Sequence, residues 1–316
     1  MEAQIYFLQY IKKILAPNVS LVDELAEILA MSNDSIYRRL RGETALSLEE
    51  TFKIAAHYHI SIDSLFKISS SEKFTYFSYK PIHTEQDLLK YLQMIEEDIS
   101  IIAQHKGQMI YAATDLPIFY NFAYPELAAF KLYAWKRYAQ VNNQKPDLFT
   151  FDKLDADWWK LCQNIYKLYQ NISSVEIWTN QTIDSTIQQI NYYNDLALFE
   201  NPTDAKKLVE QLIILIEHIK QKTFLNHQPF SLYQSEVTLD NNCIMTEIQG
   251  QKKVYLRHQN LNVLVTKDDI FCEDTSAGLN TIIGKSVLLS GSSERIRHLF
   301  FQDILKKCET LHKKIS

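Results

Sequence analysis

The chain has 316 residues, and 46% of them are hydrophobic, so it can bury a full core and is not a disordered chain. Its formal net charge of −5 excludes a protein that is covered in nucleic acid, so any DNA-binding function needs a local cluster of positive charge. Six glycines and seven prolines are few for this length, which favours helices with short loops over a sandwich with many turns.

The four cysteines lie far apart, and no Cys or Cys/His spacing is typical of a metal site. We therefore expect reduced thiols in a cytoplasmic protein. No signal peptide is predicted, because Lys12 and Lys13 follow the first apolar stretch instead of preceding it. The longest aliphatic run, 212–216, is far shorter than a membrane span. The sequence thus predicts no metal, no cofactor and no membrane partner.

The first 68 residues predict a bundle of short helices. Apolar residues recur with a helical period over 5–15, and Pro17 ends this helix. Ser20 is placed to cap a second helix and Ser32 to cap a third. Since these caps precede apolar residues at helical spacing, we expect the helices to pack against one another.

The third predicted helix, 32–41, carries most of the positive charge of this region. Ile36 and Leu40 are predicted to face the core at a spacing of four. The residues left to face outward are Asn33, Ser35, Tyr37, Arg38 and Arg41. The helix ends in three arginines: Arg38, Arg39 and Arg41. A short helix with polar residues at its start and arginines at its end is shaped to enter the DNA major groove.

The segment after this helix predicts a stop and two further helices. Gly42 lies where a helix end needs a left-handed residue. Ser47 and Glu50 form a capping-box pattern at the start of a fourth helix, and a last turn is predicted over 62–66. The first 68 residues hold seven lysines and arginines against nine acids. We therefore expect a confined basic patch with modest non-specific affinity for DNA.

Residues 18–68 resemble the lambda-repressor-like, or XRE-type, helix-turn-helix family. The matching stretches are LAEILAMS, SIYRRLRG and LSLEETFKIAAHYHISIDSLF. In that family a five-helix bundle presents its third helix to the major groove. The chain departs from the family at Val22, where a glutamine often contacts phosphate, and at Arg39, where the family often has a packed apolar residue. We expect Arg39 to extend outward from this position.

The resemblance implies that the third helix and the loop after it hold the DNA-contacting residues. The residues predicted to read bases are Asn33, Asp34, Tyr37 and Arg38. The residues predicted to bind phosphates are Ser20, Ser35, Arg39, Arg41 and Thr44. The chemistry of these residue types agrees, because asparagine suits adenine, arginine suits guanine, and backbone amides at helix starts suit phosphates.

A second interpretation remains open for this region. Arginines in the last turn of any helix are favoured by the helix dipole. Some lambda-repressor-like domains bind proteins instead of DNA. The alternative to a DNA reader is therefore an adaptor that docks a protein partner through the same helical module.

The rest of the chain predicts a linker over 69–82 and an α+β domain over 83–316. The stretch FTYFSY within the linker alternates weakly and predicts an edge strand of the next domain. Thr84 caps a long helix that Gly107 ends, and further helices alternate with two short strands. Four strands then follow between 231 and 266, with hairpin turns predicted at 240–242 and 249–251. Helices with a mostly antiparallel sheet define an α+β fold.

No catalytic signature occurs in this second region. GxGxxG, Walker, GxSxG and HExxH patterns are all missing from the sequence, so we predict no enzymatic activity, with an enzyme of unknown type as the third alternative. We expect the region to form a homodimer and to sense a small-molecule or protein effector. The candidate segments are the C-terminal helix 293–315 and the aromatic stretch 119–138. The sequence thus predicts a cytoplasmic transcription regulator that binds double-stranded DNA.

Overall fold

The computed structural model describes residues 2–15, 19–58, 60–66, 75–139, 147–224, 229–259, 262–291 and 294–315. The chain divides into two compact units, Met1–Tyr76 and Phe77–Ser316. The first part of the predicted linker, 69–74, lies outside the described residues.

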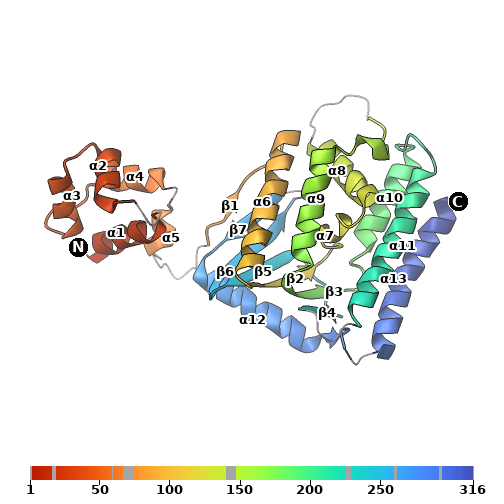
Figure 1. Ribbon diagram of the computed structural model, residues 1–316. Coiled ribbons are helices and arrows are strands. Elements are labelled where there is room, and N and C mark those ends of the chain that lie inside the picture. The colour runs from red at the N-terminus through yellow and green to blue at the C-terminus, as the bar shows by residue number, and fades with distance from the viewer. Residues whose placement is uncertain are drawn as a thin grey trace. The chain divides into compact units, whose positions relative to one another are not determined.

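The first unit is all α-helical (Figure 1). Its helices are α1 (Glu2–Ile14), α2 (Leu21–Leu29), α3 (Asn33–Leu40), α4 (Leu48–His57) and α5 (Ile62–Phe66). The predicted caps are confirmed, since the side chains of Ser20, Ser32 and Ser47 each accept a backbone N–H at the start of a helix. The core is built from apolar residues of all five helices: Phe7, Leu8, Ile11, Leu25, Leu29, Ile36, Ile54, Ala55 and Leu65.

The second unit contains one eight-stranded mixed sheet among its described residues. The strands are β1 (Ser78–Tyr79), β2 (Gln108–Ala113), β3 (Ser173–Trp178), β4 (Phe230–Gln234), β5 (Cys243–Ile248), β6 (Gln251–His258), β7 (Asn262–Thr266) and β8 (Val287–Leu288). Their order is β1-β7-β6-β5-β2-β3-β4-β8. Only β2, β3 and β4 run parallel to one another, so the predicted mostly antiparallel sheet is confirmed, with β1 as the expected edge strand.

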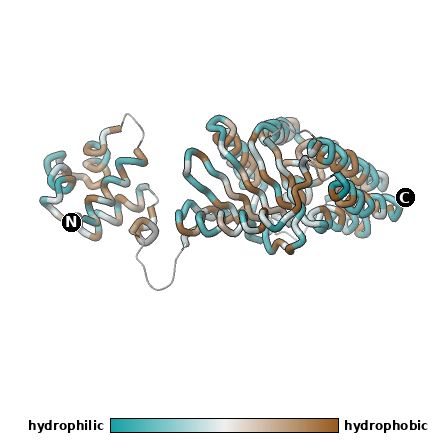
Figure 2. The backbone as a smooth tube through the Cα atoms, turned by 90° about the horizontal axis from the view of Figure 1, so that it is seen from below, coloured by the Kyte–Doolittle hydropathy of each residue, from teal (hydrophilic) through white to brown (hydrophobic). Residues whose placement is uncertain are grey.

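Helices cover both faces of this sheet (Figure 1). One face packs against α12 (Asp269–Lys285) through a small core that includes Ile177, Val254 and Leu279. The other face carries the main core and the remaining helices: α6 (Glu85–Gln104), α7 (Ile118–Asn121), α8 (Pro125–Ala139), α9 (Ala156–Tyr169), α10 (Asp184–Asp195), α11 (Asp204–Lys222) and α13 (Glu294–Ile315). Figure 2 shows hydrophobic stretches inside the second unit, and β2 and β3 are mostly buried, as strands covered on both faces require.

A fully buried carboxylate connects β3 to two of the covering helices. Glu176 in β3 is 0% exposed and accepts hydrogen bonds from Tyr120 Oη at 2.6 Å, from Trp178 Nε1 at 2.8 Å and from the Tyr169 hydroxyl. Burial raises the pKa of Glu176, and it also raises the pKa values of both tyrosines. Because α7 supplies Tyr120 and α9 supplies Tyr169, this one side chain fixes both helices on the sheet.

One of the two predicted hairpins is wrong. Residues 240–242 do not join neighbouring strands, because β4 pairs with β3 and β8 whereas β5 pairs with β2 and β6. Instead of closing a turn, Asn242 accepts a hydrogen bond from Thr114 N at 2.7 Å through its side-chain oxygen. The other predicted turn is confirmed: Gln249 and Gly250 both have positive φ angles, of 51° and 80°, and link β5 to β6.

The predicted apolar face of the C-terminal helix is only partly buried. Phe300, Ile304 and Cys308 are buried at 2% or less, and α13 packs closely against α11. Ile296 and Leu299 are 41% and 54% exposed, because a period of 3.6 residues rotates them away from the buried stripe. No described helix is long and apolar enough to cross a membrane.

Gly107→Ala tests the close approach between the end of α6 and β5. A Cβ atom at this position would lie 2.9 Å from both the Glu247 carbonyl oxygen and Ile248 Cγ1. We expect a loss of about 1–3 kcal/mol in the free energy of unfolding, because the backbone must shift to relieve the clash. Urea unfolding followed by tryptophan fluorescence measures this, since all four tryptophans lie in the second unit.

Gly278→Ala is the matched control for this substitution. Gly278 lies in α12, and a Cβ atom there would meet nothing within 4 Å. We expect no loss, or a gain of up to about 1 kcal/mol from the higher helix propensity of alanine. Equal stability of the two variants would contradict the tight packing at Gly107.

Candidate nucleic-acid interface and a cavity in the second unit

Helix α3 turns one apolar face inward and one polar face outward. Ile36 is 1% exposed and anchors the helix in the core of the first unit. The predicted base-reading residues Asn33, Asp34, Tyr37 and Arg38 are all exposed. Asn33 is oriented by α2, because its Nδ2 donates to Asp23 Oδ1 at 3.0 Å. The structure thus brings the four residues to one accessible helix, while their role in reading bases stays a prediction.

The three arginines of this region have different environments. Arg39 forms a bidentate pair with Glu50, with Nη2–Oε1 and Nε–Oε2 distances of 2.7 and 3.0 Å, and its side chain is only 14% exposed. Arg41 pairs with Glu43 at 2.6 Å on the surface, where 57% of the Arg41 side chain is exposed. Arg38 is exposed and has no ion-pair partner among the described residues. Arg38 is therefore the arginine of this group that is free to meet an anion.

The expected outward extension of Arg39 is wrong. Its Nη1 also donates to the Ser35 carbonyl oxygen at 3.2 Å, so all three guanidinium nitrogens are engaged within the first unit. The apolar position of the related family is filled here by an ion pair with Glu50 of α4. A phosphate contact from Arg39 would require this ion pair to break. The role of Arg39 in binding phosphate stays a prediction.

The loop after α3 is fixed from two sides. Gly42 has a φ of 74°, as predicted, and the Glu43 N–H donates to the Arg38 carbonyl oxygen at 2.9 Å. From α1, Gln4 Nε2 donates to the carbonyl oxygens of Arg39 and Thr44 at 2.8 and 2.9 Å. A loop held in this way presents its backbone with little cost in conformational entropy.

The predicted phosphate-binding residues lie on α2, α3 and this loop. Ser20 is exposed at the cap of α2, and Ser35 is half-buried beside the α3 cap, where its Oγ lies 3.0 Å from Ser32 Oγ. Thr44 is half-buried in the loop. Acidic residues stand among them, and Glu43 in particular lies beside Arg41. The interface therefore has mixed charge, in line with modest non-specific affinity.

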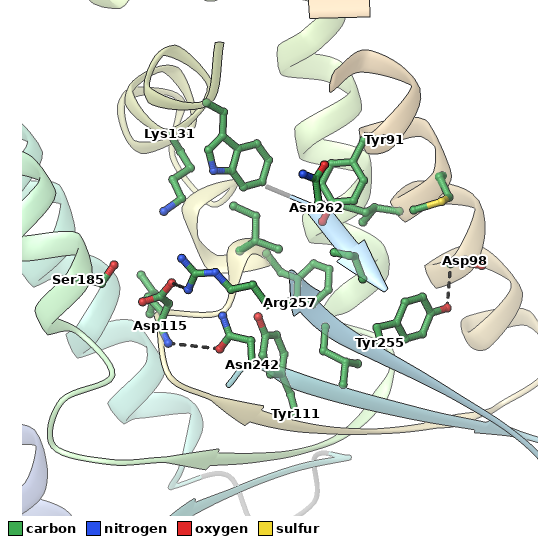
Figure 3. Close-up of a pocket in the computed structure, with 18 of the residues that line it drawn as sticks. Tyr91, Asp98, Tyr111, Asp115, Lys131, Ser185, Asn242, Tyr255, Arg257 and Asn262 are labelled. Atoms are coloured by element: carbon green, nitrogen blue, oxygen red, sulfur yellow. Dashed lines mark hydrogen bonds and ion pairs between the residues drawn. The ribbon is translucent and has the colours of Figure 1, made fainter. Parts of the chain in front are cut away.

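The second unit contains a cavity of about 430 Å³. Its walls come from α6, α8 and α10, and strands β2, β5, β6 and β7 form its floor, so segments far apart in the sequence meet there (Figure 3). The aromatic stretch 119–138, predicted as a pocket or dimer segment, contributes Phe119, Trp135 and Tyr138. This volume is in the range of pockets that bind small organic molecules.

Sequence reasoning missed the charged residues of this cavity. Asp115 and Arg257 form an ion pair across it, although 142 positions separate them in the sequence. No local sequence motif predicts such a pair, because the two residues come together only through the strand order, in which β5 alone separates β6 from β2. Among the described residues, no group of three or more His, Cys, Asp or Glu side chains is arranged to hold a metal ion.

Comparison with known families places a DNA-binding, helix-turn-helix-like domain of transcription regulators over residues 9–175. It is the BetR domain, and because the match covers more than half of the 316 residues, the chain belongs to the BetR family. The match begins in α1 and ends in β3, so it continues into the second unit. No curated protein and no solved structure matches the chain. The match does not name the lambda-repressor-like family, so that resemblance stays a prediction.

Glu50→Gln tests how much the pair with Arg39 stabilises the junction of α3 and α4. The hydrogen bond from Arg39 lowers the pKa of Glu50, so the stabilisation is complete above the ordinary carboxyl pKa and is lost as pH falls through the folded-state value. Near pH 7 we expect the variant to lose about 1–2 kcal/mol of protection over 33–57. Hydrogen exchange of the full chain, measured by mass spectrometry, detects this loss.

Glu49→Gln is the matched control, because Glu49 is 74% exposed and lies 3.9 Å from its partner Lys53. Gln at position 50 can still serve the capping box with Ser47, so the comparison isolates the ion pair. Wild type and Glu50→Gln should converge once the pH falls below the lowered folded-state pKa of Glu50, where the carboxyl gains a proton. A difference that persists unchanged at that pH would contradict the assignment.

Proposed function

We propose that this chain is a cytoplasmic, sequence-specific transcription regulator of the lambda-repressor-like kind, and that it does not act as an enzyme. Helix α3 enters the major groove, and Arg38 reads a base edge there. The main support for this proposal is the difference between two neighbouring arginines. Arg39 is bound to Glu50, whereas Arg38 is exposed beside Tyr37. Membership of the BetR family supports the DNA-binding role.

The ion pair between Arg39 and Glu50 supports the proposed role of Arg38 in reading a base. Adjacent helix residues project about 100° apart, so a side chain fixed toward α4 at position 39 holds position 38 on the outer face. Asn33 at the helix start is oriented by Asp23. Preorganised side chains lose less entropy on binding, which favours specific contacts over loose ones.

We further propose that the regulator works as a homodimer. Two linked reading helices gain affinity through effective concentration, and their centres would lie about 34 Å apart to meet successive major grooves. Most of the apolar stripe of α13 is already used within one chain, whereas Ile296 and Leu299 remain exposed. These two exposed side chains are the part of the apolar face of α13 that could contact a second copy of the chain.

One observation favours the adaptor as a second candidate. Leu48 and Phe52 are 85% and 63% exposed on α4, and their spacing of four places them on one face. Exposed apolar side chains that adjoin one another are typical of protein-docking sites. In this alternative α4, and not α3, contacts the partner.

Arg38→Ala tests the proposed base contact. We expect the variant to bind its preferred genomic fragment about tenfold or more weakly, because a bidentate contact to guanine is lost. Gel shift at low salt, with a genomic fragment library as the starting material, measures the affinity. The control is Lys13→Ala, which removes an exposed cation of α1 and should change specific binding little.

Equal affinities of the Arg38→Ala and wild-type proteins would reject α3 as the reading helix. If the full chain instead shows no salt-dependent DNA binding and co-elutes with a protein, the adaptor is favoured. If the Phe52→Ser variant then no longer binds that protein, the contact lies on α4.

Glu43→Gln tests the mixed charge of the interface. The carboxylate of Glu43 holds Arg41 and faces the side that DNA would approach, so its removal frees one cation and deletes one repulsive charge. We expect binding to tighten roughly three- to tenfold at low salt, with a smaller gain at high salt. Fluorescence anisotropy over a salt series measures both quantities.

Glu27→Gln is the control for this change, because Glu27 is an exposed acid of α2 that carries the same charge. It should tighten binding less than Glu43→Gln does. Weaker binding of Glu43→Gln than of wild type would show that Arg41 needs its partner to be positioned, and would contradict the prediction.

A further inference from the structure

The cavity of the second unit has an imbalance of charge. Among the described residues, two carboxylates line it, and each already has a cationic partner. Asp98 pairs with Lys253, with Nζ 2.9 and 3.1 Å from its two oxygens, and it also accepts the Tyr255 hydroxyl at 2.9 Å. Asp115 pairs with Arg257. The negative charge of the lining is therefore neutralised before any other cation is considered.

Two further cations line the same cavity. Lys131 and Arg137 of α8 have no carboxylate partner among the described residues, and no described group accepts a hydrogen bond from Lys131 Nζ. Lys131 is half-buried, and its desolvation lowers the pKa of the amino group despite the nearby charge of Asp115. Arg137 lies over the Tyr193 ring, 5.5 Å from its centroid. An uncompensated cation in such a site is costly unless an anion joins it.

Neutral hydrogen-bond donors face the same space. The Asn242 side-chain oxygen accepts from Thr114 N at 2.7 Å and from Asp115 N at 3.3 Å, which fixes its amide so that the NH₂ group faces away from that loop. Tyr111 lines the cavity at 4% exposure, and its hydroxyl has no hydrogen-bond partner among the described residues. Ser185 of α10 also lines this side. These groups offer N–H and O–H donors to an anionic oxygen.

Apart from Asp98, which is bonded to Lys253 and Tyr255, the labelled charged residues of the lining lie away from its aromatic side (Figure 3). Lys131, Ser185 and the Asp115–Arg257 pair lie on one side of the view, with the Lys131 amino group directed toward that pair. Tyr91 and Tyr255 lie on the other side. Apolar side chains complete the walls: Met94, Ile95, Ile99, Ile102, Phe119 and Trp135. A ligand that fits both ends has one charged group and one apolar body.

We infer that this cavity binds a small organic monoanion, a carboxylate on an aromatic or aliphatic body. The carboxylate meets Lys131 and the Asn242 amide beside the Asp115–Arg257 pair, and the body packs against Tyr91 and the apolar walls. As an effector site this inference rests on the proposed regulatory function, whereas as a binding site it rests on the cavity alone. It gives the proposed effector a chemical class.

Calorimetry on the full chain tests the binding site with three probe anions: indole-3-acetate, 4-phenylbutanoate and decanoate. Each is compared with its own neutral amide, which has nearly the same shape. We expect at least one anion to bind about tenfold or more tightly than its amide, because only the anion compensates Lys131. If no anion binds more tightly than its amide, the inference is overturned.

Lys131→Met is the diagnostic variant, and Lys160→Met is its control, because Lys160 is an exposed cation of α9 outside the cavity. We expect Lys131→Met to reduce binding of the anion to the level of its amide. We also expect it to raise the thermal midpoint of the ligand-free chain, since a desolvated cation without a partner is removed. Unchanged anion binding in Lys131→Met overturns the inference, and so does a ligand-free midpoint that falls.

A DNA titration with and without the bound anion separates this inference from the proposed function. If the chain binds the anion but no DNA, the proposed regulatory function is refuted and the proposed anion site is supported. If the chain binds DNA specifically but binds no anion, the proposed anion site is refuted and the proposed regulatory function is supported. A change of DNA affinity on anion binding supports both.

Discussion

The bidentate pair between Arg39 and Glu50 decides how the first unit presents its surface. Glu50 accepts the guanidinium of α3 and the backbone N–H of Ser47 together, so one carboxylate joins the capping box of α4 to the last turn of α3. Its low exposure makes this pair stronger than an ordinary surface ion pair. With position 39 fixed inward, the polar residues of α3 are left outside, and Gln4 of α1 holds the following loop in place. The proposed interface is thus a consequence of how three helices are tied together.

In the second unit, Asn242 has a comparable organising role. Its side-chain oxygen accepts hydrogen bonds from the backbone of Thr114 and Asp115, which ties the end of β2 to the start of β5. This contact places Asp115 against Arg257 of β6 and so assembles the charged end of the cavity. It lies where the sheet changes from parallel pairing, β2 with β3, to antiparallel pairing, β2 with β5.

Local signals predicted most of the fold. The serine caps of α2, α3 and α4, the stop at Gly42 and the turn at Gly250 depend on neighbouring residues only, and they are present as expected. Long-range strand pairing could not be predicted in the same way. The residues at 240–242 are typical of a hairpin turn, but β4 lies beside β3. The residue pattern of one strand does not determine which strand pairs with it. The same limit explains the interpretation of Arg39, whose partner Glu50 belongs to the next helix, and the missed pair of Asp115 with Arg257.

The extent of the family match has a structural consequence. It ends at residue 175, inside β3, whereas β2 requires β3 on one side and β5 on the other, and β1 requires β7. A chain cut at that residue would leave backbone N–H and C=O groups of β2 unpaired along both edges, which is costly for a buried strand. The cavity is divided by the same cut, because Lys131 lies within the matched region and Arg257 beyond it. The matched region is therefore smaller than the unit that folds, and both the sheet and the charged end of the cavity need the remainder of the chain.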